Sequence, residues 1–129
     1  MTNHNVADQV QNGPHLAGYS ISHNDHFHHL QINDRLVKLS PTEYRLCMCL
    51  LRHMEGLQQF ALRPREYLAQ EAPNVYVSFE DLQRYANLST RVHVTRHVSN
   101  ANGKLKIHGI SIICVGECGY TLDFQRLSS

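Results

Sequence analysis

Basic side chains gather in one stretch of the chain that has no acidic residue. Between Leu82 and Gly116 there is no Asp or Glu, while the chain as a whole carries a net charge of only +1. The basic residues of the stretch are Arg84, Arg91, Arg96, Lys104 and Lys106. One-signed charge on a short stretch is typical of a surface that faces nucleic acid, because Lys and Arg displace counterions from phosphates. A solvated basic helix without a partner is the alternative that charge alone leaves open.

The spacing within this stretch separates a buried side from an exposed one. Val94, Val98, Ala101 and Leu105 follow one another at 4, 3 and 4 residues, which predicts a helix over 90–105 with one buried stripe. The polar residues expected on the other side are Arg91, Thr95, Arg96, Ser99, Asn100 and Asn102. Arginine suits phosphates, as does Lys104, and an Asn at position 100 can pair with adenine in the major groove. Solvated helix surface is the alternative for the two asparagines.

Histidines form a second group with possible chemistry. His23, His26, His28 and His29 lie close together, with Asp25 among them. Two of them, His26 and His28, would share one face of a strand and begin a Zn or Ni site. No cysteine is near and no known ligand spacing is present, so a surface cluster is the favoured interpretation and no metal is predicted.

The remaining reactive residues predict neither catalysis nor a cofactor. Cys114 and Cys118 flank an expected hairpin turn, whereas Cys47 and Cys49 point to different faces of an expected helix. Without a secretory signal pattern, reduced thiols in a cytoplasmic protein are expected. There is no glycine-rich phosphate loop, no nucleophile elbow and no spaced carboxylate pair, so the chain is not expected to be an enzyme.

Three helices are expected to position the basic stretch. Ser40-Pro41-Thr42-Glu43 is a capping box with proline in the first turn, and it predicts a core helix to about His53. Ser78 caps a second helix that runs through Tyr85, and Thr90 caps the helix over 90–105. Two capped helices joined by a few polar residues are typical of a helix-turn-helix.

Strands are expected on both sides of these helices. The runs near Tyr19 and Ile21, over 27–32 and over 36–39 predict a small antiparallel N-terminal sheet. After the third helix the period changes to two, and the turn Gly116-Glu117 predicts a β-hairpin over 110–124. The expected fold is therefore α+β, a winged helix-turn-helix with an N-terminal sheet, a three-helix core and a C-terminal hairpin wing.

The chain of 129 residues is long enough for one domain. We expect residues 1–15 to be a flexible polar tail and residues 16–125 to form the domain. The segment 54–77 between the first two helices is unusual, with Pro64 opening a short helix over 65–72. No apolar stretch is long enough to span a bilayer, so no membrane partner is expected.

Four blocks of sequence resemble the OmpR/PhoB-type output domains of bacterial response regulators. LSPTEYRL at 39–46 is close to that family's L-T-P-T-E-Y-x-L, and VSFEDL at 77–82 is similar to V-S-R-E-E-L. VTRHVSNANGKL at 94–105 resembles V-D-V-H-V-S-N-L-R-R-K-L, and 112–122 resembles I-R-T-V-R-G-x-G-Y-x-L. The resemblance implies sequence-specific binding of double-stranded DNA, usually by two copies on repeated half-sites. It also implies DNA contacts by His97 and Ser99.

The chain departs from this family at several positions. Asn102 and Gly103 stand where the family commonly has arginines, and Ala101 replaces a core leucine. Gly116 and Glu117 replace the Arg-Gly of the wing, which puts an acidic tip near phosphates. The 54–77 segment is longer than in the family, and neither a receiver domain nor a membrane anchor is expected.

Two alternatives to a transcriptional regulator therefore stay open. The first is a degenerate winged helix that binds a protein partner through the apolar residues of 54–77, which are Leu57, Phe60, Leu62, Tyr67 and Leu68. The second is a histidine-dependent metal or pH sensor that controls DNA binding.

Overall fold

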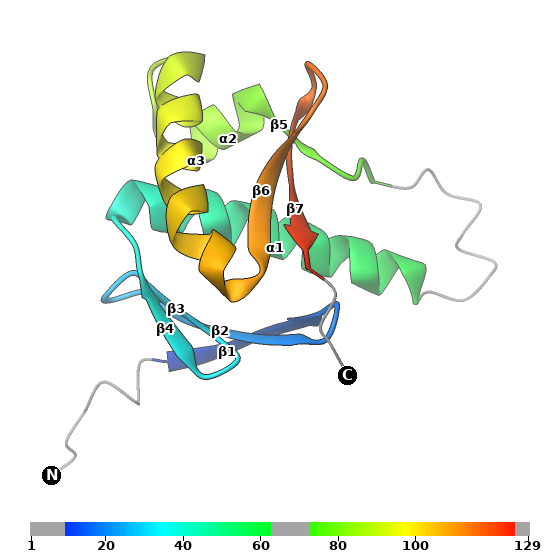
Figure 1. The fold of residues 1–129 in the computed structure, drawn as a ribbon. Coiled ribbons are helices and arrows are strands. Elements are labelled where there is room, and N and C mark those ends of the chain that lie inside the picture. Colours follow the sequence, from blue (N-terminus) through cyan, green and yellow to red (C-terminus); the bar gives the residue numbers. More distant parts are fainter. Residues whose placement is uncertain (1–9, 63–72, 126–129) are drawn as a thin grey trace, which may run out of the picture.

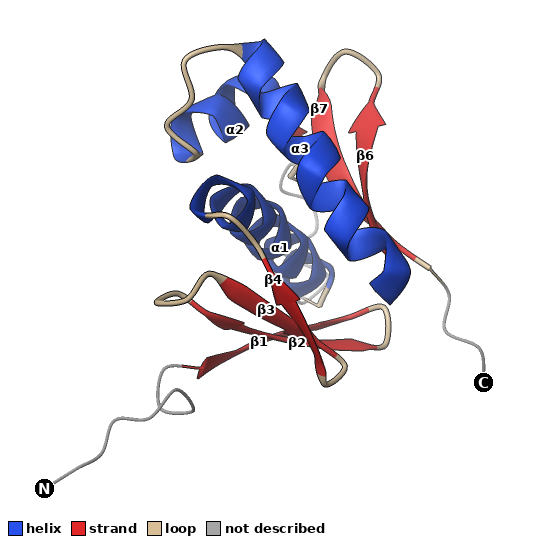
Figure 2. Cartoon of the chain, turned by 60° about the vertical axis from the view of Figure 1, so that its left-hand side comes forward, coloured by secondary structure: helices blue, strands red, loops and turns tan. Residues whose placement is uncertain are grey.

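The computed structural model describes residues 10–62 and 73–125, and these form three layers. A four-stranded sheet makes one outer layer, the long helix α1 crosses the middle, and two further helices with a β-hairpin make the other outer layer (Figures 1 and 2). This is the α+β winged helix-turn-helix that the sequence predicts.

The N-terminal sheet is a meander of β1 (Val10–Leu16), β2 (Tyr19–Asn24), β3 (His29–Ile32) and β4 (Arg35–Lys38). Ala17-Gly18 and Asn33-Asp34 form its two-residue turns, and all four have positive φ, the requirement of a type I′ turn. Two expectations are corrected here. Residues 10–15, expected in the polar tail, belong to β1, and the strand expected from position 27 begins at His29.

Helix α1 (Pro41–Ala61) begins with the predicted capping box. The Ser40 N–H donates to Glu43 Oε1 at 2.8 Å, and the Glu43 N–H donates to Ser40 Oγ at 3.2 Å. The helix runs to Ala61 rather than to about His53, so the first part of the unusual 54–77 segment is helical. The helix expected over 65–72 lies outside the described residues.

The helix-turn-helix consists of α2 (Phe79–Tyr85) and α3 (Arg91–Leu105). The side chains of Ser78 and Thr90 accept from the backbone N–H groups of Asp81 and His93, so both predicted caps are confirmed. A short 3₁₀ turn, η3 (Lys106–His108), follows α3.

The second sheet joins the hairpin to the helices. Its order is β5 (Val77–Ser78), β7 (Gly119–Phe124) and β6 (Ile110–Val115), and its hairpin has the predicted bounds. A Cβ on Gly119 would lie 1.9 Å from the carbonyl oxygen of Val77, so the close pairing of β5 with β7 requires glycine at this position.

The core lies on both sides of α1. The predicted stripe of α3 is buried at Val94, Val98, Ala101 and Leu105. The Tyr19 hydroxyl donates to the carbonyl oxygen of Gln125 at 2.7 Å, which links the N-terminal sheet to the end of β7. Within residues 10–62 and 73–125, no helix has the length and apolar character needed to cross a bilayer.

Candidate nucleic-acid interface

Helix α3 and the β6–β7 hairpin stand side by side on the surface of the molecule. The first turn of α3 and the hairpin turn both lie at the end away from the N-terminal sheet (Figures 1 and 2). The exposed residues of α3 are Arg91, Val92, Thr95, Arg96, Ser99, Asn100, Gly103 and Lys104, while His93, His97 and Asn102 are half-buried. The helix therefore presents one continuous face to solvent beside a protruding hairpin.

The centre of this exposed face carries three polar residues with free side chains. Arg96, Ser99 and Asn100 are exposed, and none of them forms a side-chain hydrogen bond or ion pair with any residue of 10–62 or 73–125. On successive turns of a helix, an arginine can donate hydrogen bonds to a phosphate and an asparagine can bond to the edge of a base. These three residues lie where the sequence predicts them.

Arg91 and Thr95 lie on the flank of the face and have contacts within the protein. The Arg91 guanidinium carbon is 3.6 Å from the centre of the Phe79 ring, a cation–π contact between α3 and α2. The Thr95 hydroxyl donates to the carbonyl oxygen of Arg91 at 3.2 Å. Both side chains stay exposed, so these contacts orient them without burying them.

Asn102 is turned away from the exposed face that the sequence predicts for it. Its Nδ2 donates to the carbonyl oxygen of Ile112 at 3.1 Å, and its Oδ1 accepts from the Ile112 N–H at 3.0 Å. One half-buried side chain thus satisfies both backbone groups of a residue in β6. Asn102 holds the hairpin against α3, a role that sequence reasoning did not identify.

Lys104, predicted as a phosphate contact, forms an ion pair inside the protein. Its Nζ lies 2.6 Å from Oε1 of Glu43, a residue with only 4% of its surface exposed. Burial raises the pKa of Glu43, but hydrogen bonds from Lys104 and Ser40 outweigh burial and lower it below the ordinary value. The pair connects the first turn of α1 to the last turn of α3.

The hairpin is the least basic part of this surface. Residues 110–124 contain no Lys or Arg, and Glu117 stands exposed in the turn, as the sequence indicates. Cys114 and Cys118 are exposed free thiols, whereas Cys47 is buried, and burial raises its pKa to about 12. Any contact of the hairpin with phosphates must therefore use backbone N–H groups and hydroxyls.

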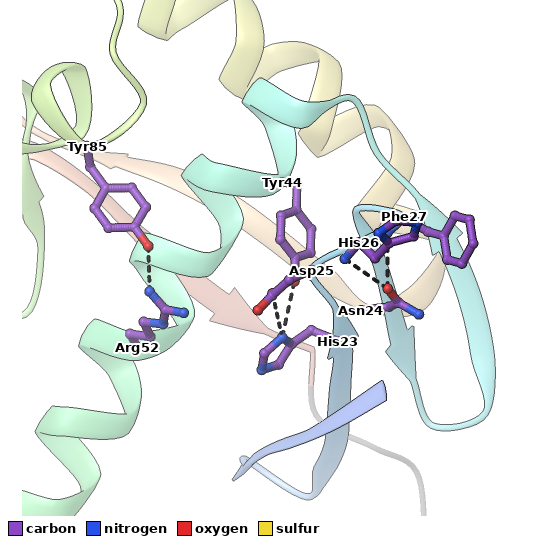
Figure 3. A network of polar contacts seen from close by, with 8 residues as sticks. All are labelled: His23, Asn24, Asp25, His26, Phe27, Tyr44, Arg52 and Tyr85. Carbon is purple, nitrogen blue, oxygen red and sulfur yellow. Dashed lines mark hydrogen bonds and ion pairs between the residues drawn. The ribbon is translucent and has the colours of Figure 1, made fainter. Parts of the chain in front are cut away.

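The histidine cluster extends from His23 in β2 through the β2–β3 loop to His29 at the start of β3. Figure 3 shows His23, Asp25 and Tyr44 converging, with His23 Nδ1 at 3.0 Å from Asp25 Oδ1 and 3.1 Å from the Tyr44 hydroxyl, which itself donates to Asp25. His26 and His28 belong to the loop and not to a strand, so the shared strand face expected for them does not exist. Their rings pack against aromatic rings instead.

The same figure shows a separate hydrogen bond between α1 and α2. Arg52 donates to the hydroxyl of Tyr85 at 2.6 Å, next to the site where Tyr44 meets the β2–β3 loop. Among residues 10–62 and 73–125 there is no group of three or more His, Cys, Asp or Glu that could hold a metal ion. The network is a set of structural contacts between the N-terminal sheet and the helices.

Two exposed residues of α3 are not among the contacts that sequence reasoning singles out. Val92 has 68% of its surface exposed in the first turn of α3, and Gly103 faces open space, because a Cβ added to it would meet nothing within 4 Å. Helical spacing identifies both, because Val92, Arg96, Ser99 and Gly103 follow one another by three or four residues opposite the buried stripe.

Two solved structures are similar to the described chain. The DNA-binding domain of the response regulator AdeR, in complex with an intercistronic region, has a TM-score of 0.57 and 22% identity, covering 81% of this chain and 93% of that one. The DNA-binding domain of Escherichia coli CadC has a TM-score of 0.56 and 18% identity, covering 89% and 91%. No protein-family model and no curated protein matches the chain. The chain therefore shares the winged-helix fold of these two domains.

Proposed function

We propose that the chain is a transcriptional regulator that binds double-stranded DNA, with α3 in the major groove and the β6–β7 hairpin as the wing. The observation that carries this proposal is the exposed face of α3, where the side chains of Arg96, Ser99 and Asn100 form no hydrogen bond or ion pair with any described residue. The shared fold supports it, since one similar domain is bound to DNA and the other is described as DNA-binding.

The contacts divide into phosphate contacts and base contacts. Arg96 and Arg91 reach phosphates, with Thr95, His97 and Ser99 as further polar contacts along the helix. Asn100 reads a base edge, with adenine as the preferred partner of a side-chain amide. Asn102 and Lys104 support the interface indirectly, because their polar groups already bind Ile112 and Glu43.

The proposal predicts a moderate dependence of binding on salt. Arg91 and Arg96 are the arginines of α3, and the hairpin adds no basic side chain. About two phosphate contacts give a slope near −2 in a plot of log affinity against log salt. The proposal includes binding by two copies on repeated half-sites, so we expect the selected DNA to contain a direct or inverted repeat.

The experiment is a titration of the whole chain with double-stranded DNA. A random duplex library is enriched on the protein through several rounds, and the affinity of the enriched duplex is measured at several salt concentrations. The proposal expects one enriched motif and a slope near −2. Failure to enrich any motif, together with salt-independent background binding, contradicts it.

A protein-interaction module is the second candidate, and it rests on a different surface. Leu62 at the end of α1 and Val75 before β5 have 80% and 61% of their surfaces exposed, on either side of the undescribed residues 63–72. Neither side chain belongs to α3 or to the β6–β7 hairpin. If no DNA motif is enriched, this surface is the one to test for a protein partner.

A further inference from the structure

Val92 is an apolar side chain on a polar helix face. It belongs to the first turn of α3 and has 68% of its surface exposed. A β-branched residue on an exposed helix surface lowers helix stability relative to alanine, lysine or glutamine, so packing and helix formation give no reason for valine at this position.

The polar side chains next to Val92 are oriented by contacts within the protein. The Arg91 guanidinium lies over the Phe79 ring, and His93 Nδ1 is 3.2 Å from the Ser89 hydroxyl. The Thr95 hydroxyl is bonded to the backbone of Arg91. The first turn of α3 therefore presents an outward apolar surface, the two methyl groups of Val92, with the guanidinium of Arg96 one turn further along.

The major groove offers one apolar group to a protein, the C5-methyl of thymine. The first residues of a recognition helix are the ones that reach base edges, and Val92 belongs to the first turn of α3. That turn lies at the end of the molecule that also carries the hairpin turn (Figures 1 and 2). We propose that Val92 reads a thymine methyl group and sets a thymine preference at one position of each half-site. This inference rests on the proposed function.

The effect expected from one methyl contact is small and measurable. Burying one methyl group favours binding about fourfold, so removal of the thymine methyl weakens binding by about that factor. Deoxyuridine lacks only this methyl and keeps the pairing with adenine. A duplex in which a single thymine is replaced by deoxyuridine therefore isolates the contact.

The experiment uses the duplex enriched by the wild-type chain, with each thymine replaced in turn by deoxyuridine. Binding is measured for the wild type, for Val92→Ala and for the matched control Ile107→Val, which removes one methyl from an exposed residue of η3, beyond the last turn of α3. Val92→Ala keeps the fold, because alanine has the higher helix propensity and nothing packs over this exposed side chain.

We expect the wild type and Ile107→Val to bind about fourfold more weakly when one particular thymine is replaced, and Val92→Ala to bind both duplexes equally. If no thymine is sensitive, if Val92→Ala keeps the sensitivity, or if Ile107→Val loses it as well, the assignment of Val92 is wrong while DNA binding stands. If no duplex is enriched at all, the proposed function fails and the assignment fails with it.

Discussion

The carboxylate of Glu43 accepts from the Ser40 N–H at 2.8 Å and from Lys104 Nζ at 2.6 Å, so one side chain both caps α1 and holds α3. Glu43 and Lys104 are 61 positions apart in the sequence. Through this pair the orientation of α3 depends on the first turn of α1, and the stability of the proposed interface becomes sensitive to pH.

Acid should weaken the fold through Glu43. Burial raises the pKa of Glu43, but the hydrogen bonds from Lys104 and Ser40 lower it by more, so the pKa lies below 4.5 in the folded state. The unfolded chain therefore binds the proton more tightly, so this stabilisation is present above about pH 4.5 and is lost as the pH falls through the folded-state pKa. Denaturant unfolding at pH 6 and pH 3 should show a larger loss in the wild type than in Glu43→Gln.

Asp25 does not disturb this comparison. The hydrogen bond from Tyr44 lowers the pKa of Asp25, so protonation of Asp25 in acid also destabilises the fold. This loss is the same in the wild type and in Glu43→Gln, so it cancels in the comparison. Glu80→Gln, at an exposed position in the first turn of α2, is the matched control and should behave like the wild type. Equal acid losses in wild type and Glu43→Gln contradict the role of the pair.

Lys104 and Arg96 should affect different measurements. Lys104→Met leaves a buried carboxylate without its cation, so the free energy of unfolding should fall by about 1–2 kcal/mol, with the salt slope of DNA binding unchanged. Arg96→Met should leave stability within about 0.5 kcal/mol and make the slope less negative by about 1. A reduced slope in Lys104→Met contradicts the assignment of Lys104 to Glu43.

Asn102 should control the attachment of the hairpin. Asn102→Ala leaves the N–H and carbonyl groups of Ile112 without their side-chain partner, so stability should fall by about 1–3 kcal/mol. Hydrogen exchange of the Ile112 amide should become faster than in the wild type by more than the global loss of stability explains. Asn100→Ala is the control, since its side chain is exposed and has no bond in the described protein. Unchanged protection of the Ile112 amide from exchange in Asn102→Ala would rule out a role for Asn102 in attaching the hairpin to α3.

Gly103 should be replaceable with a gain in stability. It lies within α3, has no positive φ, and a Cβ there meets nothing within 4 Å. Gly103→Ala should therefore raise the free energy of unfolding by about 0.5–1 kcal/mol, because glycine loses more backbone entropy in a helix. Thermal or denaturant unfolding measures this change directly. A lower stability of Gly103→Ala would contradict the conclusion that a Cβ fits at this position.

Local signals in the sequence are sufficient for the helices of the winged core. Ser40, Ser78 and Thr90 each accept a backbone N–H three residues later, as their types and positions predict. The stripe at Val94, Val98, Ala101 and Leu105 is buried because its spacing matches the helical period. These features depend on neighbours within one or two turns, so they can be read without knowing the fold.

Features that depend on distant contacts cannot be predicted in this way. β1 has no apolar alternation because it is an edge strand with an irregular register between Asn12 and His15, so its sequence looks like part of a polar tail. The prediction that Asn102 is exposed is wrong for a local reason, because this residue follows the buried Val98 by four residues and so lies beside it on the helix. Its partner Ile112 becomes known only when the hairpin is positioned.

The most direct test of the central claim is to map the DNA-contacting surface by NMR. The backbone amides of the labelled chain are followed during titration with the enriched duplex. We predict the largest shifts in the exposed residues of α3, above all Val92, Arg96, Ser99 and Asn100, and in the hairpin turn around Glu117. Shifts that concentrate instead on the outer face of the N-terminal sheet, at Ser22 and Gln31, would contradict it.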